Sequence, residues 1–258
     1  MNYQDINSKT IDQWVKDGWV WGTPISHEEF ERALRGDWKV VLTPNKTVPA
    51  EWFGDLRGKK VLGLASGGGQ QMPLFTAAGA QCTVLDYSEK QLAQEKMVSE
   101  REGYDITIIR ADMTKPLPFE DESFDLIFHP VSNCYVEEVK PIFRECYRIL
   151  KDGGILLAGL DNGINYIFGD DEKELLNSLP FNPLKNEEHM KQLEADNSGV
   201  QFSHTMDEQL GGQLEAGFIL THIMEDINDE GNLKEHNIPC FVATRAVKRN
   251  DLQPCKLI

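Results

Sequence analysis

The sequence predicts an α/β fold: a doubly wound, mostly parallel sheet of seven strands with one antiparallel edge strand. From residue 58 onward, short apolar or β-branched runs alternate with helical patterns. The runs are nearly continuous in apolar residues, which is typical of parallel strands buried on both faces. The last two runs are joined by a polar loop too short for a crossover helix, so we expect them to pair antiparallel at one sheet edge.

The expected elements follow from these patterns in chain order. Residues 1–57 carry all five tryptophans, and Ser26 with Glu29 forms a capping box that begins a helix ending near Gly36. A core domain, residues 58–258, is expected to follow, with an insertion at about 161–205. Strands are predicted at 60–65, 82–87, 106–111, 124–129, 154–160, 218–227 and 240–247, and helices at 70–79, 89–102, 135–150 and 206–216.

Composition narrows the possible partners and location. The net charge of −16 over 258 residues disfavours nucleic acid and anionic bilayers as partners. No apolar run is long enough to span a bilayer and the first ten residues lack signal-peptide features, so we expect a cytoplasmic protein. Five widely spaced cysteines without a C-x-x-C pair suit a reducing compartment and indicate no metal site; they are Cys82, Cys134, Cys146, Cys240 and Cys255.

A glycine-rich turn follows the first predicted strand in "VLGLASGGGQQMP", residues 61–73. Glycines between a strand and a helix let a ligand approach the backbone closely. Asp86, at the end of the second predicted strand, is placed to accept hydrogen bonds from both ribose hydroxyls. The turn lacks the G-K-[ST] of a P-loop. It also lacks the usual G-x-G-x-x-G spacing, but NAD binding stays open as an alternative.

Four blocks of sequence in a fixed order carry a resemblance to a known family. They are "VLGLASGGGQQ" (61–71), "VLDYSEKQL" (84–92), "IIRADMTKPLPFEDESFDLIFHPVSN" (108–133) and "RECYRILKDGGILLAGL" (144–160). Together they resemble class I S-adenosylmethionine-dependent methyltransferases, especially the type-11 group of ubiquinone- and menaquinone-type enzymes. The resemblance implies the Rossmann-like methyltransferase fold, S-adenosylmethionine as cofactor, S-adenosylhomocysteine as product, and residues 58–258 as the methyltransferase domain.

The resemblance also implies roles for individual residues. The loop residues Ala65, Ser66, Gly67 and Gly69 would surround the methionine part of the cofactor. Asp86 would bind the ribose, with Tyr87 beside the adenine and Gln91 nearby. Asp112 would accept a hydrogen bond from the adenine amino group, with Met113 against the ring. His129 and Asn133 would line the place where cofactor and acceptor meet. The sequence departs from the family where an acid is usual, at Gly63, and Gln70 and Gln71 are our candidates for holding the cofactor's ammonium group.

Residues for the acceptor and for catalysis are predicted from their positions in the chain. His129, at the end of a strand, is the candidate general base, although such a histidine is as often a structural hydrogen-bonding group. The N-terminal Trp19 and Trp21 are expected near the site, because aromatic faces hold cations or flat molecules. Tyr135, Tyr166 and Phe168 complete the expected acceptor contacts, the last two on a lid formed by residues 161–205.

Three functions compete at this stage. The favoured one is a methyltransferase that acts on a small-molecule acceptor. An NAD-dependent oxidoreductase and a non-catalytic module that binds S-adenosylmethionine are the alternatives. The polar run "HPVSN" at 129–133 favours catalysis over the module.

Overall fold

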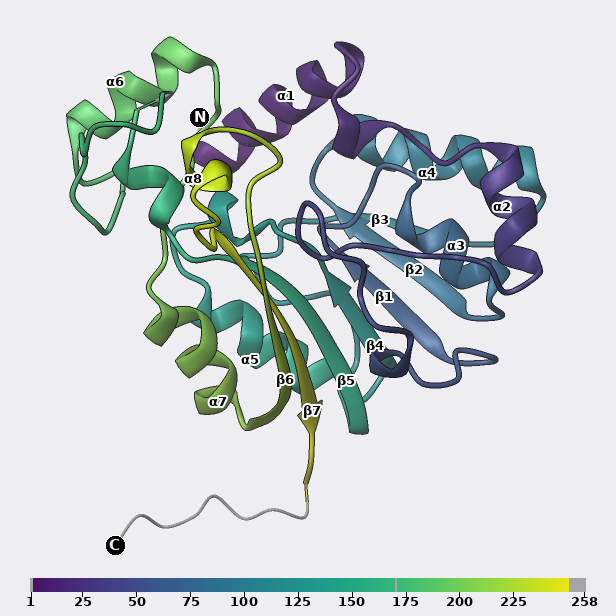
Figure 1. The fold of residues 1–258 in the computed structure, drawn as a ribbon. Coiled ribbons are helices and arrows are strands. Elements are labelled where there is room, and N and C mark those ends of the chain that lie inside the picture. Colours follow the sequence, from purple (N-terminus) through teal and green to yellow (C-terminus); the bar gives the residue numbers. More distant parts are fainter. Residues whose placement is uncertain (1, 170, 251–258) are drawn as a thin grey trace, which may run out of the picture.

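The computed structural model describes residues 2–169 and 171–250, which form a seven-stranded sheet between two layers of helices (Figure 1). The strand order is β3-β2-β1-β4-β5-β7-β6. Only β7 runs antiparallel to its neighbours, and it lies between β5 and the outermost strand β6. The predicted doubly wound sheet is thus confirmed, with the antiparallel pairing at one edge. The strands are β1 (Lys60–Leu64), β2 (Gln81–Asp86), β3 (Thr107–Arg110), β4 (Phe124–His129), β5 (Leu150–Asp161), β6 (Phe218–Asp226) and β7 (Phe241–Lys248).

An apolar core lies on each face of the sheet. One core joins the sheet to α2, α3, α4 and the loop before β1, and the other joins it to α5 and α7. Figure 1 shows these two groups of helices on opposite sides of the strands. The helices are α1 (Tyr3–Lys16), α2 (His27–Leu34), α3 (Gln71–Ala77), α4 (Glu89–Glu102), α5 (Lys140–Ile149), α6 (Glu187–Asp196), α7 (Gly212–Ala216) and α8 (Asn232–Glu235), with shorter turns η1 (Val20–Gly22), η2 (Ala50–Trp52), η3 (Asn133–Tyr135), η4 (Ile164–Ile167) and η5 (Asp207–Gly211).

The N-terminal extension contributes residues to the first core and to the edge of the sheet where the strands have their carboxyl ends. Trp38 packs edge-on against Phe53 and Phe75 in the first core. Helix α1 instead lies across the carboxyl ends of the strands, where the Ser8 hydroxyl donates to the Tyr87 carbonyl, 3.0 Å away. The predicted capping box of Ser26 and Glu29 is present at the start of α2. The extension therefore brings its residues to the edge where ligands of such sheets bind.

The predicted helix at 135–150 is wrong in its first turn. Residues 133–135 form η3, Val136 is extended, and α5 begins only at Lys140. Pro141 stands in the first turn of α5, where its missing N–H is not needed; it would block an earlier start of the helix. The carbonyl oxygens of Asn133 and Val136 lie 3.0 and 2.9 Å from His204 Nε2. Tertiary hydrogen bonding thus takes the place of a helical turn here.

Two observations bear on the expected location and cysteine chemistry. Within 2–169 and 171–250, no helix has the length and apolarity to cross a membrane. The four described cysteines, Cys134 among them, are free and buried. Cys255 lies outside the described residues.

Candidate functional site

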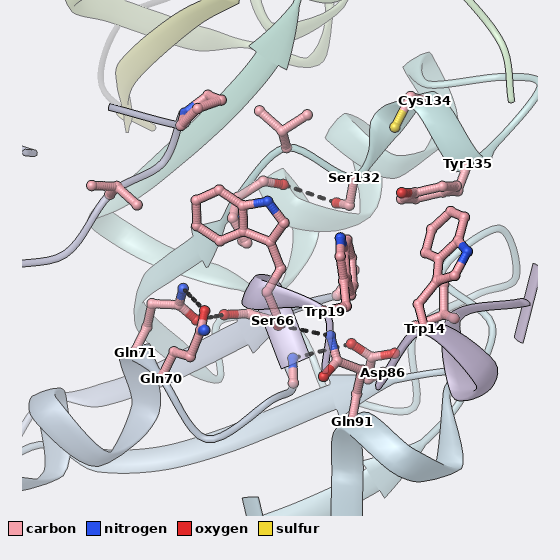
Figure 2. A pocket seen from close by; sticks show the side chains of 18 of the residues that line it. Trp14, Trp19, Ser66, Gln70, Gln71, Asp86, Gln91, Ser132, Cys134 and Tyr135 are labelled. Carbon is pink, nitrogen blue, oxygen red and sulfur yellow. Dashed lines mark hydrogen bonds between the residues drawn. The ribbon is translucent and has the colours of Figure 1, made fainter. Parts of the chain in front are cut away.

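A cavity of about 590 Å³ opens where β1, β2 and β4 end (Figure 2). A smaller cavity of about 70 Å³ adjoins it beside β2 and β3. Five residues line both cavities, so the two form one continuous site: Ile11, Ala65, Asp86, Ser132 and Tyr135. The larger cavity is also lined by Trp14, Asp17, Gly18, Trp19, Trp21, Val41, Leu42, Thr43, Pro44, Ser66, Gly67, Gln70, Gln71, Gln91, Pro130, Val131, Cys134 and Phe241.

The glycine turn is held in shape by hydrogen bonds within the protein. Gly67 N–H donates to Asp86 Oδ2 at 3.0 Å, Gly68 N–H to the Gln91 carbonyl at 3.0 Å, and Gly69 N–H to Glu95 Oε1 at 2.7 Å. Gly68 has a φ of 102°, and a Cβ there would lie 2.8 Å from the Trp21 carbonyl oxygen. All three amides point to groups of the protein, so the turn offers a ligand a tightly shaped wall.

The family usually has an acidic residue at the position of Gly63. Here Met72 occupies the space that a side chain at position 63 would need. A Cβ on Gly63 would lie 2.8 Å from Met72 Sδ and 2.9 Å from its Cε, and Met72 is fully buried. The first turn of α3 thus packs directly on β1. No acidic side chain at position 63 could reach the cavity without displacing this methionine.

Asp86 connects the glycine turn to the second strand. Its Oδ2 accepts from Gly67 N–H and its Oδ1 accepts from Ser88 N–H, at 3.0 and 2.9 Å. Burial raises the pKa of the Asp86 carboxyl, and the backbone N–H donors oppose that rise. Each carboxylate oxygen has more than one acceptor direction, so Asp86 can still accept hydrogen bonds from a ligand.

The smaller cavity brings together the residues expected around an adenine. Tyr87, Asp112 and Met113 line it, from the ends of β2 and β3. The Tyr87 ring is fixed between the Arg110 guanidinium, 4.9 Å from its centroid, and a hydrogen bond from its hydroxyl to Asp5. Asp112 Oδ1 accepts from the Thr114 N–H and hydroxyl, which orients the carboxylate.

Three glutamines surround the turn. Gln70 Nε2 donates to the carbonyl oxygens of Val20 and Thr23, at 2.7 and 2.8 Å, and Gln91 Nε2 donates to the Trp21 carbonyl at 3.1 Å. These bonds attach the N-terminal segment around η1 to the cofactor turn. Gln71 is buried and accepts from the Ser66 hydroxyl at 3.0 Å. Gln70 therefore links the turn to the N-terminal segment, and Gln71 is one of the cavity-lining residues.

Tryptophans form the other side of the larger cavity. Trp14, Trp19 and Trp21 line it, as does Tyr135. The rings of Trp14 and Trp19 lie 5.2 Å apart and those of Trp14 and Tyr135 lie 6.5 Å apart. Figure 2 shows these rings facing the cavity, across from Gln70 and Gln71. The sequence-based placement of Trp19 and Trp21 at the site agrees with this geometry, and Trp14 joins them.

His129 ends β4 and Asn133 begins η3, as their positions in the sequence suggested, but neither side chain is part of the cavity lining. His129 is fully buried, with Nδ1 2.9 Å from the Leu64 carbonyl oxygen and Nε2 2.8 Å from Asn133 Oδ1. Burial lowers the pKa of the His129 imidazole. Asn133 is equally buried and donates to Gln209 Oε1. Neither lines the described cavity, so the expected roles as base and ligand contact are corrected: the pair holds β4 against β1 beneath the site.

Tyr166 and Phe168 also lie away from the cavity lining. The Tyr166 hydroxyl donates to Gln201 Oε1 at 3.0 Å, and its ring packs on Phe181. Phe168 forms an isolated bridge with Leu175. No described residue of 162–205 is among those that line the larger cavity. Their expected acceptor contacts are therefore corrected, because the segment packs on itself and on η3; its action as a lid stays a prediction.

Sequence reasoning missed two groups at the site. Val41 to Pro44 line the cavity because the Asp226 carboxylate holds this loop, accepting from the Thr43 hydroxyl and from Asn45 N–H, each at 2.8 Å. Phe241, at the start of β7, lines it through strand pairing. Neither group carries a motif, so no local signal could have found them. In the part of the chain described, no three His, Cys, Asp or Glu side chains gather as metal ligands would.

Comparisons with known proteins identify the fold and the chemistry. A methyltransferase-domain family model matches residues 62–158. The chain is 41% identical to a Bacillus subtilis (strain 168) protein described as the uncharacterized methyltransferase YbaJ, over 94% of this chain and 97% of the relative.

Solved structures agree with the sequence relatives. An S-adenosylmethionine-dependent methyltransferase from Mesorhizobium loti has a TM-score of 0.60 and 22% identity, covering 77% of this chain and 94% of its own. A geranyl diphosphate methyltransferase solved with S-adenosylmethionine has a TM-score of 0.55 and 15% identity, covering 77% and 82%. These comparisons support the methyltransferase prediction over the dehydrogenase and non-catalytic alternatives. The chain belongs to the class I S-adenosylmethionine-dependent methyltransferases of type 11, and S-adenosylmethionine is its cofactor.

Proposed function

We propose that this methyltransferase acts on a small-molecule acceptor that binds on the tryptophan side of the larger cavity. The observation that carries the proposal is the aromatic and apolar part of the lining, which comprises Trp14, Trp19, Trp21, Leu42 and Phe241. Concave, mostly apolar sites with few polar groups are typical of small-molecule binding. A macromolecular substrate would instead need an exposed docking surface around the reacting group.

The cofactor fits the remaining part of the site. We assign the adenine to the smaller cavity, with Tyr87 and Met113 beside the ring and Asp112 as acceptor for its amino group. Asp86, which lines both cavities, would accept from the ribose hydroxyls. The methionine part would then lie along Ala65 to Gly67, with Gln71 as the group that replaces an acid at position 63. Gly69 is buried behind the turn and would act only through the turn's shape.

The protein's own residues chiefly orient the acceptor. The bound cofactor supplies an activated methyl group on a sulfonium. Alignment of two reactants is worth ~7–11 kcal/mol of the barrier, and the aromatic walls are suited to provide it. The cavity lining contains no lysine, arginine or histidine within the described residues. An anionic acceptor would find no counter-charge there, which favours a neutral or cationic one.

Isotopic labelling tests the proposal directly. The protein would be incubated with S-adenosylmethionine labelled in the methyl group and a cell extract that has been split into a low-mass filtrate and a macromolecular fraction. We expect label in the filtrate alone, reduced about tenfold by Trp19→Ala. Label confined to protein or nucleic acid, or absent from both fractions, would refute a small-molecule acceptor.

A further inference from the structure

Three aromatic rings form a curved wall in the larger cavity. The Trp14 ring centroid lies 5.2 Å from that of Trp19 and 6.5 Å from that of Tyr135, and the ring planes are inclined by 54° and 55°. All three residues line the cavity, and Figure 2 shows their rings around it. We call these three residues the three-ring wall. Inclined rings direct their faces toward one space, and aromatic faces attract a cation or stack on a flat ring.

Tyr135 places one end of the three-ring wall beside the cofactor. Tyr135 and Asp86 line both the larger and the smaller cavity, so they lie where the two meet. In the cofactor assignment given above, Asp86 would accept from the ribose, and Ala65 to Gly67 would border the methionine part. The sulfonium joins these two parts of S-adenosylmethionine. The methyl group would therefore lie near Tyr135, and the three-ring wall would border the acceptor that receives it.

The charge of the cavity lining is negative. Four described lining residues have ionisable side chains: Asp17, Asp86, Cys134 and Tyr135. Burial raises the pKa of the Cys134 thiol and of the Tyr135 phenol, so both stay neutral near neutral pH. Asp17 is exposed and accepts from Gln13 Nε2 at 2.9 Å. Of these described lining groups, only the carboxyls can thus carry a charge, and carboxylates attract a cation and repel an anion.

The described lining also holds no group suited to take a proton from the acceptor atom. Alkylammonium groups titrate at about pH 10 and thiols at about 8.5, whereas free carboxyl groups titrate at about pH 4. A carboxylate is therefore a weak base for either, and weaker still for an alcohol. Burial raises the pKa of Asp86, but its oxygens accept from Gly67 and Ser88 N–H and would face the ribose. An acceptor atom without a proton needs no such base.

We propose that the methyl acceptor is an atom with a free lone pair and no proton, in an apolar molecule, and that methylation gives this atom a permanent positive charge. A pyridine-type ring nitrogen and a thioether sulfur share this chemistry. The inference rests on the proposed function, because it places the acceptor beside the three-ring wall. The faces of Trp14, Trp19 and Tyr135 would stabilise the charge that develops on the acceptor during transfer.

The reaction balances without a proton transfer. The lone pair of the acceptor atom forms a bond to the methyl carbon, and the carbon–sulfur bond of the cofactor breaks with its electron pair passing to sulfur. S-adenosylhomocysteine leaves as a neutral thioether. The positive charge passes from the cofactor to the acceptor, so the total charge is unchanged. Contacts that strengthen as the acceptor becomes positive lower the barrier, because they favour the transition state over the neutral acceptor.

The charge of the labelled product tests the inference with wild type alone. After separation from unreacted cofactor, we expect the labelled metabolite to be retained on a cation exchanger at about pH 7 and also at about pH 12, where an alkylamine is neutral. The mass of the product then distinguishes a ring nitrogen from a thioether sulfur. Release at about pH 12, or no retention at about pH 7, would overturn the inference and leave the small-molecule acceptor intact. Label in macromolecules would overturn the proposed function itself.

A matched pair of probes tests binding without turnover. N-methylpyridinium and N-methylpyridone share an N-methylated six-membered ring and differ in charge. Calorimetric titration of the S-adenosylhomocysteine complex measures the affinity for each. We expect the cation to bind at least about fivefold more tightly, because the aromatic faces and the carboxyl groups both favour it. Equal affinity for the two probes, tighter binding of the pyridone, or no binding of either would contradict the inference.

Variants show whether the described lining causes this preference. Trp14→Leu should lower the preference for the cation to about twofold or less, and Trp14→Phe, which keeps an aromatic face, should retain it. Both should keep their S-adenosylhomocysteine affinity within about twofold, which shows a folded cofactor site. Asp17→Asn should weaken binding of the cation alone, whereas Asp105→Asn, at an exposed carboxyl between α4 and β3, is the control. A preference that Trp14→Leu leaves unchanged would remove the three-ring wall from acceptor binding.

Discussion

The two sides of the larger cavity are built in different ways. On the cofactor side, the walls come from adjoining elements, and carboxyl groups on β2 and α4 accept hydrogen bonds from the glycine turn. On the acceptor side, the walls come from α1, η1, the loop before β1 and the start of β7, and their contacts are mainly aromatic and apolar. Under the proposed function, the contrast means that a constant ligand would be recognised by fixed backbone and carboxyl groups, whereas the acceptor would be recognised by an apolar shape assembled from distant segments.

The largest expected effect is on the free energy of unfolding, and it comes from replacing Glu95, the buried carboxyl behind the glycine turn. Burial raises its pKa to about 8 from 4.5, with the Asp86 charge adding to the rise. Because the pKa of Glu95 is raised in the folded state, folding favours the protonated carboxyl. The stability that Glu95 contributes is therefore complete below about pH 4.5 and is lost as the pH rises through about 8. Each pKa unit corresponds to ~1.4 kcal/mol. Glu95→Gln should therefore raise the free energy of unfolding by a few kcal/mol at about pH 8.5, and much less at about pH 5.5.

Urea unfolding at the two pH values measures this difference. Glu100→Gln, at an exposed position on the same helix, is the control and should change little at either pH. A stability gain in Glu95→Gln that is independent of pH would show that Glu95 does not titrate in this range.

Asp86→Ala is expected to have the next largest effect, a loss of cofactor affinity that is confined to the cofactor side. The change removes a charged acceptor for the ribose and also the partner of Gly67 N–H. Hydrogen bonds to charged groups are worth roughly 1.5–3 kcal/mol, so affinity should fall at least tenfold. Calorimetric titration with S-adenosylhomocysteine measures it. Unchanged affinity would remove Asp86 from the ribose site.

Trp19→Ala tests the acceptor side. The loss of one aromatic wall should raise the KM for the labelled metabolite about tenfold, since an aromatic contact with a cation or ring is worth ~1 kcal/mol and apolar area is lost as well. Cofactor affinity should stay within about twofold. Trp38→Phe, in the core away from the cavity lining, is the matched control. A fall in cofactor affinity with an unchanged KM would reverse the assignment of the two sides.

Gln70→Ala should give the smallest effect and act on both sides. Its amide joins the cofactor turn to the carbonyls of Val20 and Thr23. Neutral hydrogen bonds contribute ~0.5–1.5 kcal/mol each, so we expect cofactor affinity and acceptor KM each to worsen by about twofold to fivefold. Gln71→Ala should affect cofactor binding alone. If a variant that carries both Gln70→Ala and Gln71→Ala binds the cofactor as tightly as wild type does, the two glutamines do not hold the cofactor's ammonium group.

The cofactor side was largely predictable because its signals are local. Asp86 ends a strand, and the glycine turn, Asp112 and Met113 follow strands, whose apolar patterns are plain; parallel strands bring their carboxyl ends together. Gly63 was recognised as a departure, but its cause was hidden, since the methionine that fills its space belongs to the next helix. The acceptor side was only partly predictable: Trp19 and Trp21 line the larger cavity, whereas His129, Tyr166 and Phe168 do not, and the binding roles of the two tryptophans stay predictions.

The sequence by itself determined the order of strands and helices, the family and the cofactor, because periodicity and motif spacing are properties of short segments. Only the tertiary structure decided which polar groups reach the cavity. His129 ends its strand buried, with both ring nitrogens hydrogen-bonded, whereas Asp86 ends β2 as part of the cavity lining. That difference depends on which residues from distant parts of the chain pack against each side chain, and hydrogen bonding between distant residues leaves no mark on local sequence.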